Sequence, residues 1–239
     1  MLSLRFVRAV LPLPIAALVC ALFVTVPSSA QATDLDREES PKTFVTSLSF
    51  GGFWFQDDYI QASYNSKGKF VPKLTFGVVP LSRYVHIEVN LSFAFLQFPG
   101  KATFVDTGES SADSVMLTLF PLNLDLSVGI DIVDEQPVVP YGGVGVAWTL
   151  WREHVTGGGE QWSGYRLGYN AFFGAALLLD RIEQRRAREV DAAVGVNDAF
   201  LTLEGRFAKV DSELEDGDLV KGTLDFSGWS FLAGIKLVY

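Results

Sequence analysis

Of the two histidines in the chain, His154 has the only surroundings that could support catalysis. Glu153, Glu160 and Ser163 lie near it in the sequence, so together they could supply a base, an orienting acid and a nucleophile. Such groups must meet within hydrogen-bond distance, and the intervening glycine run 157–159 does not fix their positions. We therefore predict that the chain is not an enzyme, with a lipid-modifying enzyme built around His154 as one alternative.

The other residues with metal-ligand chemistry do not form a complete set. Zinc needs three or four ligands, and His86 and His154 lie far apart in the sequence. Alternating acids begin a run that resembles a calcium loop: Asp211, Glu213, Glu215, Asp216, Asp218. However, Gly217 comes one position late and no Glu follows at the twelfth position. We predict no metal and no cofactor.

The composition excludes several classes of protein. Acidic residues outnumber basic ones by 28 to 19, which argues against nucleic-acid binding because that needs basic patches. A single cysteine excludes a disulfide scaffold. Hydrophobic residues make up 49% of the chain and charged residues 20%, which excludes disorder.

The first 32 residues have the pattern of an export signal. Arg5 and Arg8 precede an apolar run over 9–26, and small residues at 28–32 fit the cleavage rule. An uncleaved membrane anchor is the alternative, because the run approaches the length that spans a bilayer. We predict a signal peptide over 1–32, a flexible leader over 33–41 and a single domain over 42–239.

Beyond residue 42, apolar side chains recur at every second position. In 225–239, one face carries only apolar and aromatic residues, Trp229 to Tyr239, and the other carries Gly, Ser and Lys236 among its residues. A period of two indicates strands with two different faces. Eight residues of strand span roughly 25 Å at ~3.3 Å per residue, which matches the outer apolar band of a membrane barrel.

The pattern predicts an all-β fold, an eight-stranded antiparallel transmembrane β-barrel with its apolar face toward lipid. The strands are expected at 43–55, 69–80, 83–97, 114–132, 139–153, 164–179, 197–209 and 225–239. Longer connections alternate with shorter ones such as 80–83, as expected for outer loops and periplasmic turns. The charged connection 180–196 favours a short periplasmic helix that caps the barrel in solvent, with contact to lipid headgroups or a periplasmic partner as the alternative.

The apolar parity changes within 114–132. Leu117 and Leu119 lie on one parity, whereas Leu122, Leu124 and Leu126 lie on the other. Pro121 sits at the change, so we expect a β-bulge there that resets the face. The alternative is a turn at Pro121, which would give ten strands.

Charged residues recur on the parity that is opposite to the apolar face. They are Lys73, Glu88, Asp125, Arg166, Glu204, Arg206 and Lys236. An eight-stranded barrel encloses only enough space for side chains, so buried charges there must pair. We predict an ion-pair network that closes the lumen; the alternative is a narrow pore for small solutes or hydrophobic molecules.

Two motifs resemble a known family. Residues 140–145 (PYGGVG) look like a strand opening, and 234–239 (GIKLVY) like a chain-terminal assembly signal, of the small outer-membrane β-barrel proteins of OmpA and OmpW type. Tyr239 replaces the more usual Phe. The resemblance implies that the barrel-assembly machinery recognises the last strand through Gly234, Leu237 and Tyr239.

Aromatic residues gather near the expected strand ends, which is typical of interfacial girdles. They are Trp54, Phe55, Trp148, Trp151, Trp162, Tyr165, Trp229 and Tyr239. We expect an outer-membrane protein with a structural or envelope-interaction role. Its expected partners are membrane lipid and lipopolysaccharide, and we expect it to be a monomer.

Overall fold

The computed structural model describes residues 42–64, 68–82, 85–103, 110–132, 136–156, 161–179, 195–215, 218–221 and 224–239. All of them belong to one compact unit, Glu39–Tyr239. The predicted signal peptide 1–32 and leader 33–41 lie outside the described residues, as does most of the predicted periplasmic helix, 180–194. Among the described residues, no helix has the length and apolar character needed to cross a membrane.

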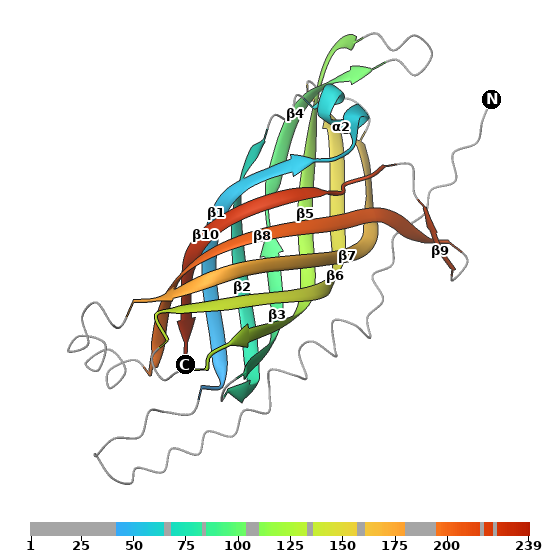
Figure 1. The fold of residues 1–239 in the computed structure, drawn as a ribbon. Helices are drawn as coiled ribbons and strands as arrows, with labels where there is room; N and C mark the ends of the chain where they lie inside the picture. The colour runs from blue at the N-terminus through green and yellow to red at the C-terminus, as the bar shows by residue number, and fades with distance from the viewer. Residues whose placement is uncertain are drawn as a thin grey trace. The chain divides into compact units, whose positions relative to one another are not determined.

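The unit consists of strands and one short helix (Figure 1). In chain order they are β1 (Phe44–Phe55), α2 (Asp58–Ser63), β2 (Lys69–Ser82), β3 (Val85–Ala94), β4 (Leu96–Thr103), β5 (Ser110–Ile130), β6 (Val138–Val155), β7 (Gln161–Leu178), β8 (Asp198–Glu215), β9 (Asp218–Lys221) and β10 (Gly228–Val238).

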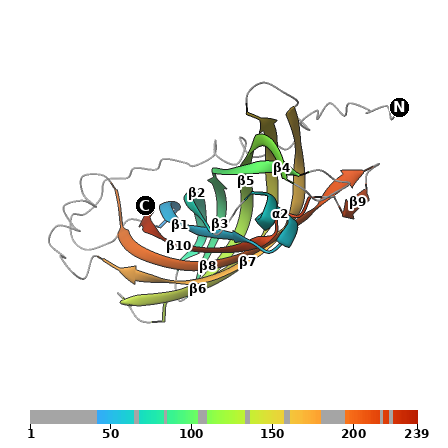
Figure 2. The same ribbon diagram turned by 90° about the horizontal axis from the view of Figure 1, so that it is seen from above.

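Eight of these strands close into an antiparallel ring in the order β1-β2-β3-β5-β6-β7-β8-β10, which confirms the predicted barrel (Figure 2). The first and last strands pair from Val45↔Val238 to Phe55↔Gly228. At the end of the barrel where Thr43 and Tyr239 lie, the Thr43 amide donates to the Tyr239 carbonyl at 2.6 Å. We call this the terminal end, and the end that carries α2 and β9 the loop end.

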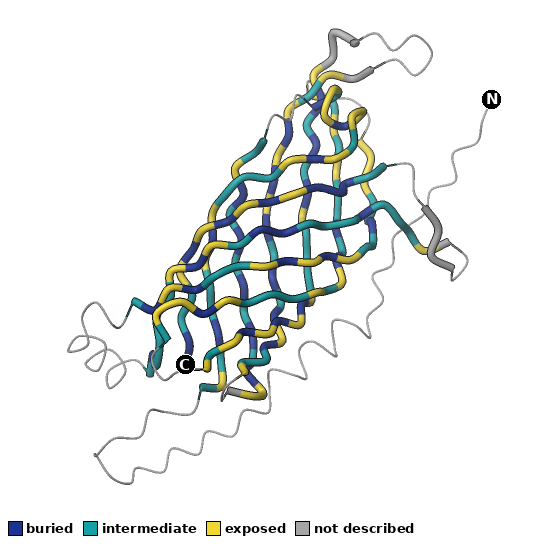
Figure 3. Tube along the Cα trace, viewed as in Figure 1, coloured by how far each residue is buried: buried dark blue, intermediate teal, exposed yellow. Residues whose placement is uncertain are grey.

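Exposed residues alternate with buried or partly buried ones along most of each strand, as the colours of Figure 3 show. On β10, Phe231 is 56% exposed and Ile235 52%, whereas the intervening Leu232 is 5% exposed. On β8, Leu201 and Leu203 are exposed and Thr202 and Arg206 are buried. The apolar face therefore points outward, as the alternation predicts.

The expected bulge at Pro121 is absent, and so is the alternative turn. β5 pairs with β6 in one unbroken register from Val115↔Val155 to Gly129↔Tyr141, and Pro121 pairs with Thr149 within it. Inward parity is also kept throughout, since both Leu119 and Asp125 are buried. The prediction was wrong because it assumed that apolar side chains always point outward. Their parity changes at Pro121 because the apolar side of the wall changes, while the strand keeps its orientation.

The environment on both sides of the wall inverts near Pro121. Toward the terminal end, β5 buries Asp125 and Ser127 and exposes Leu124 and Leu126. Toward the loop end the same inward parity buries Leu117 and Leu119, and the outward side chains beyond Phe120 become mostly polar, with Met116 between Ser114 and Thr118. The loop-end part therefore has an apolar interior and a mostly polar exterior.

The same inversion occurs on the strands beside β5. On β4, Leu96 and Phe98 are buried, whereas Gln97 and Lys101 are exposed. We call this loop-end part of the wall the collar. It consists of 96–103 of β4, 110–119 of β5, 149–155 of β6 and 161–166 of β7.

Several predicted boundaries shift because strands continue into the expected loops. β3 and β4 are one strand interrupted at Phe95, since both pair with β5 in the same register, so the predicted loop 98–113 begins as strand. Strand β2 continues to Ser82 through an irregularity after Val78, where a tight turn 80–83 was expected. The expected loop 210–224 contains the end of β8 and all of β9.

Candidate functional site in the barrel lumen

The middle of the lumen holds a compact group of charged side chains, the central cluster: Lys73, Asp125, Asn170, Glu204 and Arg206. The Lys73 ammonium lies 2.6 Å from Glu204 Oε1, and Arg206 Nε lies 3.1 Å from the same oxygen. Arg206 Nη1 donates to Asp125 Oδ2 at 2.8 Å. Two positive and two negative charges balance, as burial of charges requires.

Asn170 completes the hydrogen bonding of the central cluster. Its amide nitrogen donates to Asp125 Oδ1 at 2.9 Å, and its amide oxygen accepts from Arg206 Nη1 at 3.0 Å. The ring of Phe172 lies under the Arg206 guanidinium, 4.3 Å from its carbon. Gly145 makes room for Asp125, because a Cβ atom at this glycine would overlap the carboxylate.

These contacts cross the lumen rather than follow the sheet. Lys73 comes from β2 and Glu204 from β8, while Asp125 comes from β5. None of these strands is a neighbour of another in the ring. The central cluster therefore ties opposite walls of the barrel together.

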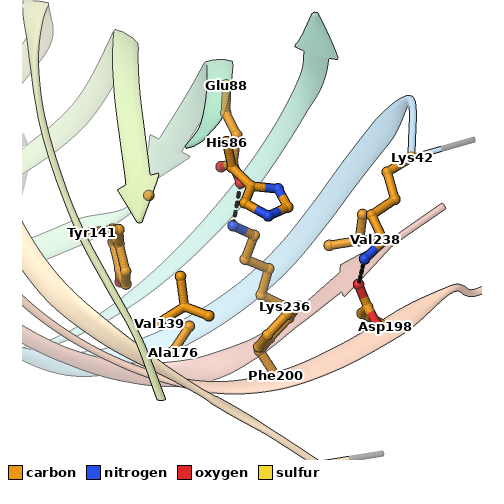
Figure 4. A pocket seen from close by; sticks show the side chains of 11 residues that line it. Lys42, His86, Glu88, Val139, Tyr141, Ala176, Asp198, Phe200, Lys236 and Val238 are labelled. Carbon is orange, nitrogen blue, oxygen red and sulfur yellow. Dashed lines mark hydrogen bonds and ion pairs between the residues drawn. The ribbon is translucent and has the colours of Figure 1, made fainter. Parts of the chain in front are cut away.

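A second group of charges lies nearer the terminal end. The Lys236 ammonium donates to Glu88 Oε1, whose other oxygen accepts from Asn90 at 3.2 Å. Around them is the pocket of Figure 4, into which Lys236, His86 and Glu88 project together. At this mouth His86 Nε2 lies 3.2 Å from Asp131 Oδ2.

The polar lumen is continuous from the mouth at the terminal end to the central cluster. Glu88, Tyr141 and Lys236 line both the pocket of Figure 4 and the next cavity, which reaches Lys73 and Arg206. The Tyr141 hydroxyl donates to Glu204 Oε2 at 3.5 Å. Toward the loop end Ser92 and Asn123 follow, and beyond them the buried polar side chains include Thr149 and Arg166.

An apolar core fills the lumen inside the collar. Its fully buried members include Phe98, Leu117 and Leu119. Helix α2 adds Ile60, which is 1% exposed, and the following Tyr64, which is 6% exposed. Sequence reasoning missed α2, although Asp57 is a suitable N-cap and accepts from the Ile60 amide at 2.9 Å.

Gly100 on β4 lets the end of α2 approach the wall. A Cβ atom at this position would lie 2.6 Å from the Ser63 carbonyl oxygen and equally close to the Tyr64 ring. Burial of the Tyr64 hydroxyl raises its pKa far above the ordinary value, and the nearby Glu153 carboxylate raises it further. Helix α2 is thus packed into the collar rather than laid over it.

Arg166 belongs to neither of these groups of charges. It is 5% exposed and lies where β8 leaves β7: the two strands pair up to Leu167↔Ser212, and the rest of β8 pairs with β9. Its guanidinium donates to Glu213, to the Tyr165 carbonyl at 2.9 Å and to the Leu224 carbonyl at 3.3 Å. The seven predicted lumen charges therefore form three separate sets.

The residues considered for catalysis do not come together. Glu153 and His154 are neighbours on β6 and so point to opposite sides of the wall, Glu153 toward Tyr64 and His154 outward. Ser163 is exposed, and Glu160 lies outside the described residues. Within the described part of the chain, no group of three or more metal-ligating side chains is present.

The outer surface carries the aromatic residues predicted for an interface, with the exceptions of Phe55, Trp151 and Trp162. Trp162 lies opposite Glu153 and shares its inward parity at the exposed loop-end rim. Trp54 and Trp229 are each 42% exposed, and Trp148 also lies on an outward position. Phe55 and Trp151 point inward instead and pack in the collar core with Phe226. Parity along the strand, which the girdle prediction ignored, separates the two sets.

Comparison with solved structures gives the same architecture. The outer membrane protein OprG from Pseudomonas aeruginosa matches with a TM-score of 0.52 and 12% identity, covering 83% of this chain and 96% of that one. The chain has the fold of the small outer-membrane barrels. Ail of Yersinia pestis is also similar, with a TM-score of 0.45 and 10% identity, covering 83% of this chain and 99% of that one. NspA of Neisseria matches with a TM-score of 0.43 and 14% identity, covering 82% of this chain and 96% of that one. No protein-family model and no curated protein matches the sequence.

Proposed function

We propose that the chain is an outer-membrane protein with a closed lumen that serves a structural or envelope-interaction role. The observation that carries this proposal is the double closure of the lumen. The central cluster links opposite walls by ion pairs, and the collar core with α2 fills the loop end. A barrel closed at two levels has no continuous water path for a solute.

The exterior supports the membrane location. Outward side chains such as Leu126, Val144 and Phe173 are 48%, 61% and 67% exposed. In water this surface would be an aggregation hazard, whereas against acyl chains it carries no such cost. The signal peptide predicted over 1–32 would supply export.

Conductance in planar lipid bilayers tests the closed lumen. We expect the full chain, its insertion verified by heat-modifiable gel mobility, to give no conductance steps above the bare bilayer. A charge-neutral variant, Lys73→Ala with Glu204→Ala, should also stay silent, because the collar core remains. Steps in the wild type would favour the narrow pore instead. Steps in the variant alone would make the central cluster a gate.

The cellular role is tested by deletion. Loss of the chain should raise the entry of large antibiotics through the outer membrane, and expression of the silent Lys73→Ala/Glu204→Ala variant should restore the barrier. A deletion strain with an unchanged barrier would contradict a structural role in the envelope.

A further inference from the structure

The outward face of the collar presents three basic side chains that the lumen does not use. Lys101 lies on β4, and Arg152 and His154 lie on β6; all three are exposed. Strand β5 joins them, because Lys101 pairs with its Ser114, His154 with Met116 and Arg152 with Thr118. We call these three residues and the strip of β5 between them the basic face.

Among the described side chains, no carboxylate shares this face. The other outward residues of the collar include Gln97, Ser114, Thr118, Gln161 and Ser163. Arg152 donates to Gln161 at 2.6 Å, and Lys101 and His154 form neither a hydrogen bond nor an ion pair with any described residue. The basic face is therefore a locally positive surface on a chain whose formal net charge is −9.

The opposite side of the barrel provides a contrast. Lys209, also outward on β8 near the loop end, lies 2.7 Å from Asp225 and 3.2 Å from Asp211. The chain therefore neutralises an outward cation there with its own carboxylates, whereas no carboxylate among the described side chains lies on the basic face. A ligand that brings negative charge would complement the described part of this face.

The level of the basic face indicates where that charge comes from. Phe120 on β5 and Trp148 on β6 are outward aromatic residues at the loop-end edge of the apolar surface. Arg152 lies four residues beyond Trp148 toward the loop end, on the same face of β6. Aromatic side chains mark the boundary between acyl chains and headgroups, so the basic face lies at headgroup level.

We propose that Lys101, Arg152 and His154 bind the phosphate groups of the glycolipid in the outer leaflet. Arginine presents a planar fork that matches phosphate, and cations at a membrane surface are attracted to anionic headgroups. The docking fixes one side of the barrel, the β4–β6 wall, against the glycolipid. This inference rests on the outer-membrane location proposed above.

Energy transfer from the protein tryptophans to labelled lipid A tests the proposal. The full chain is reconstituted in phosphatidylcholine vesicles with labelled lipid A, either phosphorylated or with its phosphates removed. We expect the phosphorylated form to bind at least about tenfold more tightly. Lys101→Gln with Arg152→Gln should weaken that binding by about fivefold for each cation removed.

A matched control removes one positive charge at the other end of the barrel. Lys42→Gln loses a cation that pairs with Asp198 at the terminal end, and it should bind like the wild type. Arg152→Lys should keep most of the affinity. Equal binding of both lipid forms, or equal losses in the Lys42→Gln and double variants, would overturn the proposal.

Two further outcomes separate the alternatives. Displacement of phosphorylated lipid A by millimolar inorganic phosphate would indicate a site for free anions and overturn the glycolipid assignment. Failure of the chain to insert into any vesicle would contradict the membrane location itself. Insertion without a preference for phosphate would contradict only this inference.

Discussion

Leu119 and Asp125 point inward from the same strand, three alternations apart, and both are 2% exposed, yet their surroundings are opposite. Leu119 packs in the apolar core of the collar, and Asp125 pairs with Arg206 in the central cluster. Strand β5 therefore passes through two parts of the barrel with opposite environments. The membrane part needs an apolar outside, whereas the collar, whose outward side chains are mostly polar, needs an apolar inside.

This arrangement predicts different outcomes for the same substitution on one face of β5. Leu126→Arg places a charge among outward apolar residues and should lower the free energy of unfolding by about 2–4 kcal/mol. Thr118→Arg, on the same outward face but in the collar, should cost less than about 0.5 kcal/mol. Urea unfolding in lipid vesicles measures both. Equal losses would contradict the inversion.

Removing one partner from the central cluster should be costly. Arg206→Met leaves Asp125 and Glu204 without their shared cation, and loss of one partner from a buried pair costs about 3–5 kcal/mol. Adding Asp125→Asn should recover part of that loss, because one unpaired charge disappears. A double-mutant cycle by urea unfolding gives the coupling. Strictly additive losses would show that the cluster does not act as a unit.

The close approach at Gly100 predicts that a side chain there displaces α2. Gly100→Val should destabilise the collar by about 1–3 kcal/mol, as overpacking does, and should speed proteolysis within 56–68. Gly129→Ala is the matched control, since its Cβ atom would meet only ordinary contacts at 3.6 Å or more. A protease pattern unchanged in Gly100→Val would mean that α2 does not depend on this contact.

A modest pH dependence is expected from Asp225. Burial alone would raise the pKa of this carboxyl, but the Lys209 ammonium and the Ser227 donors outweigh it and hold the pKa below its ordinary value. A lowered folded-state pKa adds stability above the unfolded pKa, near 3.8, that is lost as the pH falls through the folded value. Because the pair is partly exposed, the effect should stay under about 1 kcal/mol.

The check is a comparison of unfolding between pH 6 and acid for wild type and Asp225→Asn. The variant should be less stable than the wild type at pH 6, and the difference should shrink in acid. A difference that is independent of pH would contradict the role of the ion pair with Lys209.

The last residue should matter for assembly. Tyr239 accepts from the Thr43 and Phe44 amides at 2.6 and 3.0 Å, and its own amide donates to Phe44 at 2.8 Å. Deleting Tyr239 removes these closing bonds and the terminal aromatic ring, so it should reduce the heat-modifiable, folded fraction in outer-membrane preparations. Tyr239→Phe keeps both and should assemble normally. Equal assembly of the deletion would contradict the predicted signal.

Most of the barrel can be predicted from the sequence. The alternation along β10 and β8 indicates strands that separate lipid from the lumen, because every second side chain must be apolar wherever the outside is lipid. The same pattern singled out Lys73, Glu204, Arg206 and Asp125 as inward residues. Local spacing is enough for these conclusions, since parity depends only on neighbours in the chain.

Which charges meet was decided by the closed sheet. Lys73 and Glu204 are 131 residues apart, and their contact depends on the register of every strand in the ring. Arg166 had the same inward parity yet pairs with Glu213, because β8 leaves β7 at that level. No local pattern records such a separation of strands.

The collar shows where sequence reading alone fails. The sequence determined, by itself, that apolar residues alternate on both sides of Pro121, but it could not assign the two parities to lipid and core. Only the tertiary structure decided that Leu117 and Leu124 lie on opposite sides of one strand with an unbroken register. The physical reason is that an apolar side chain is equally satisfied by acyl chains or by a protein core, and only the closed barrel with α2 inside it supplies the core.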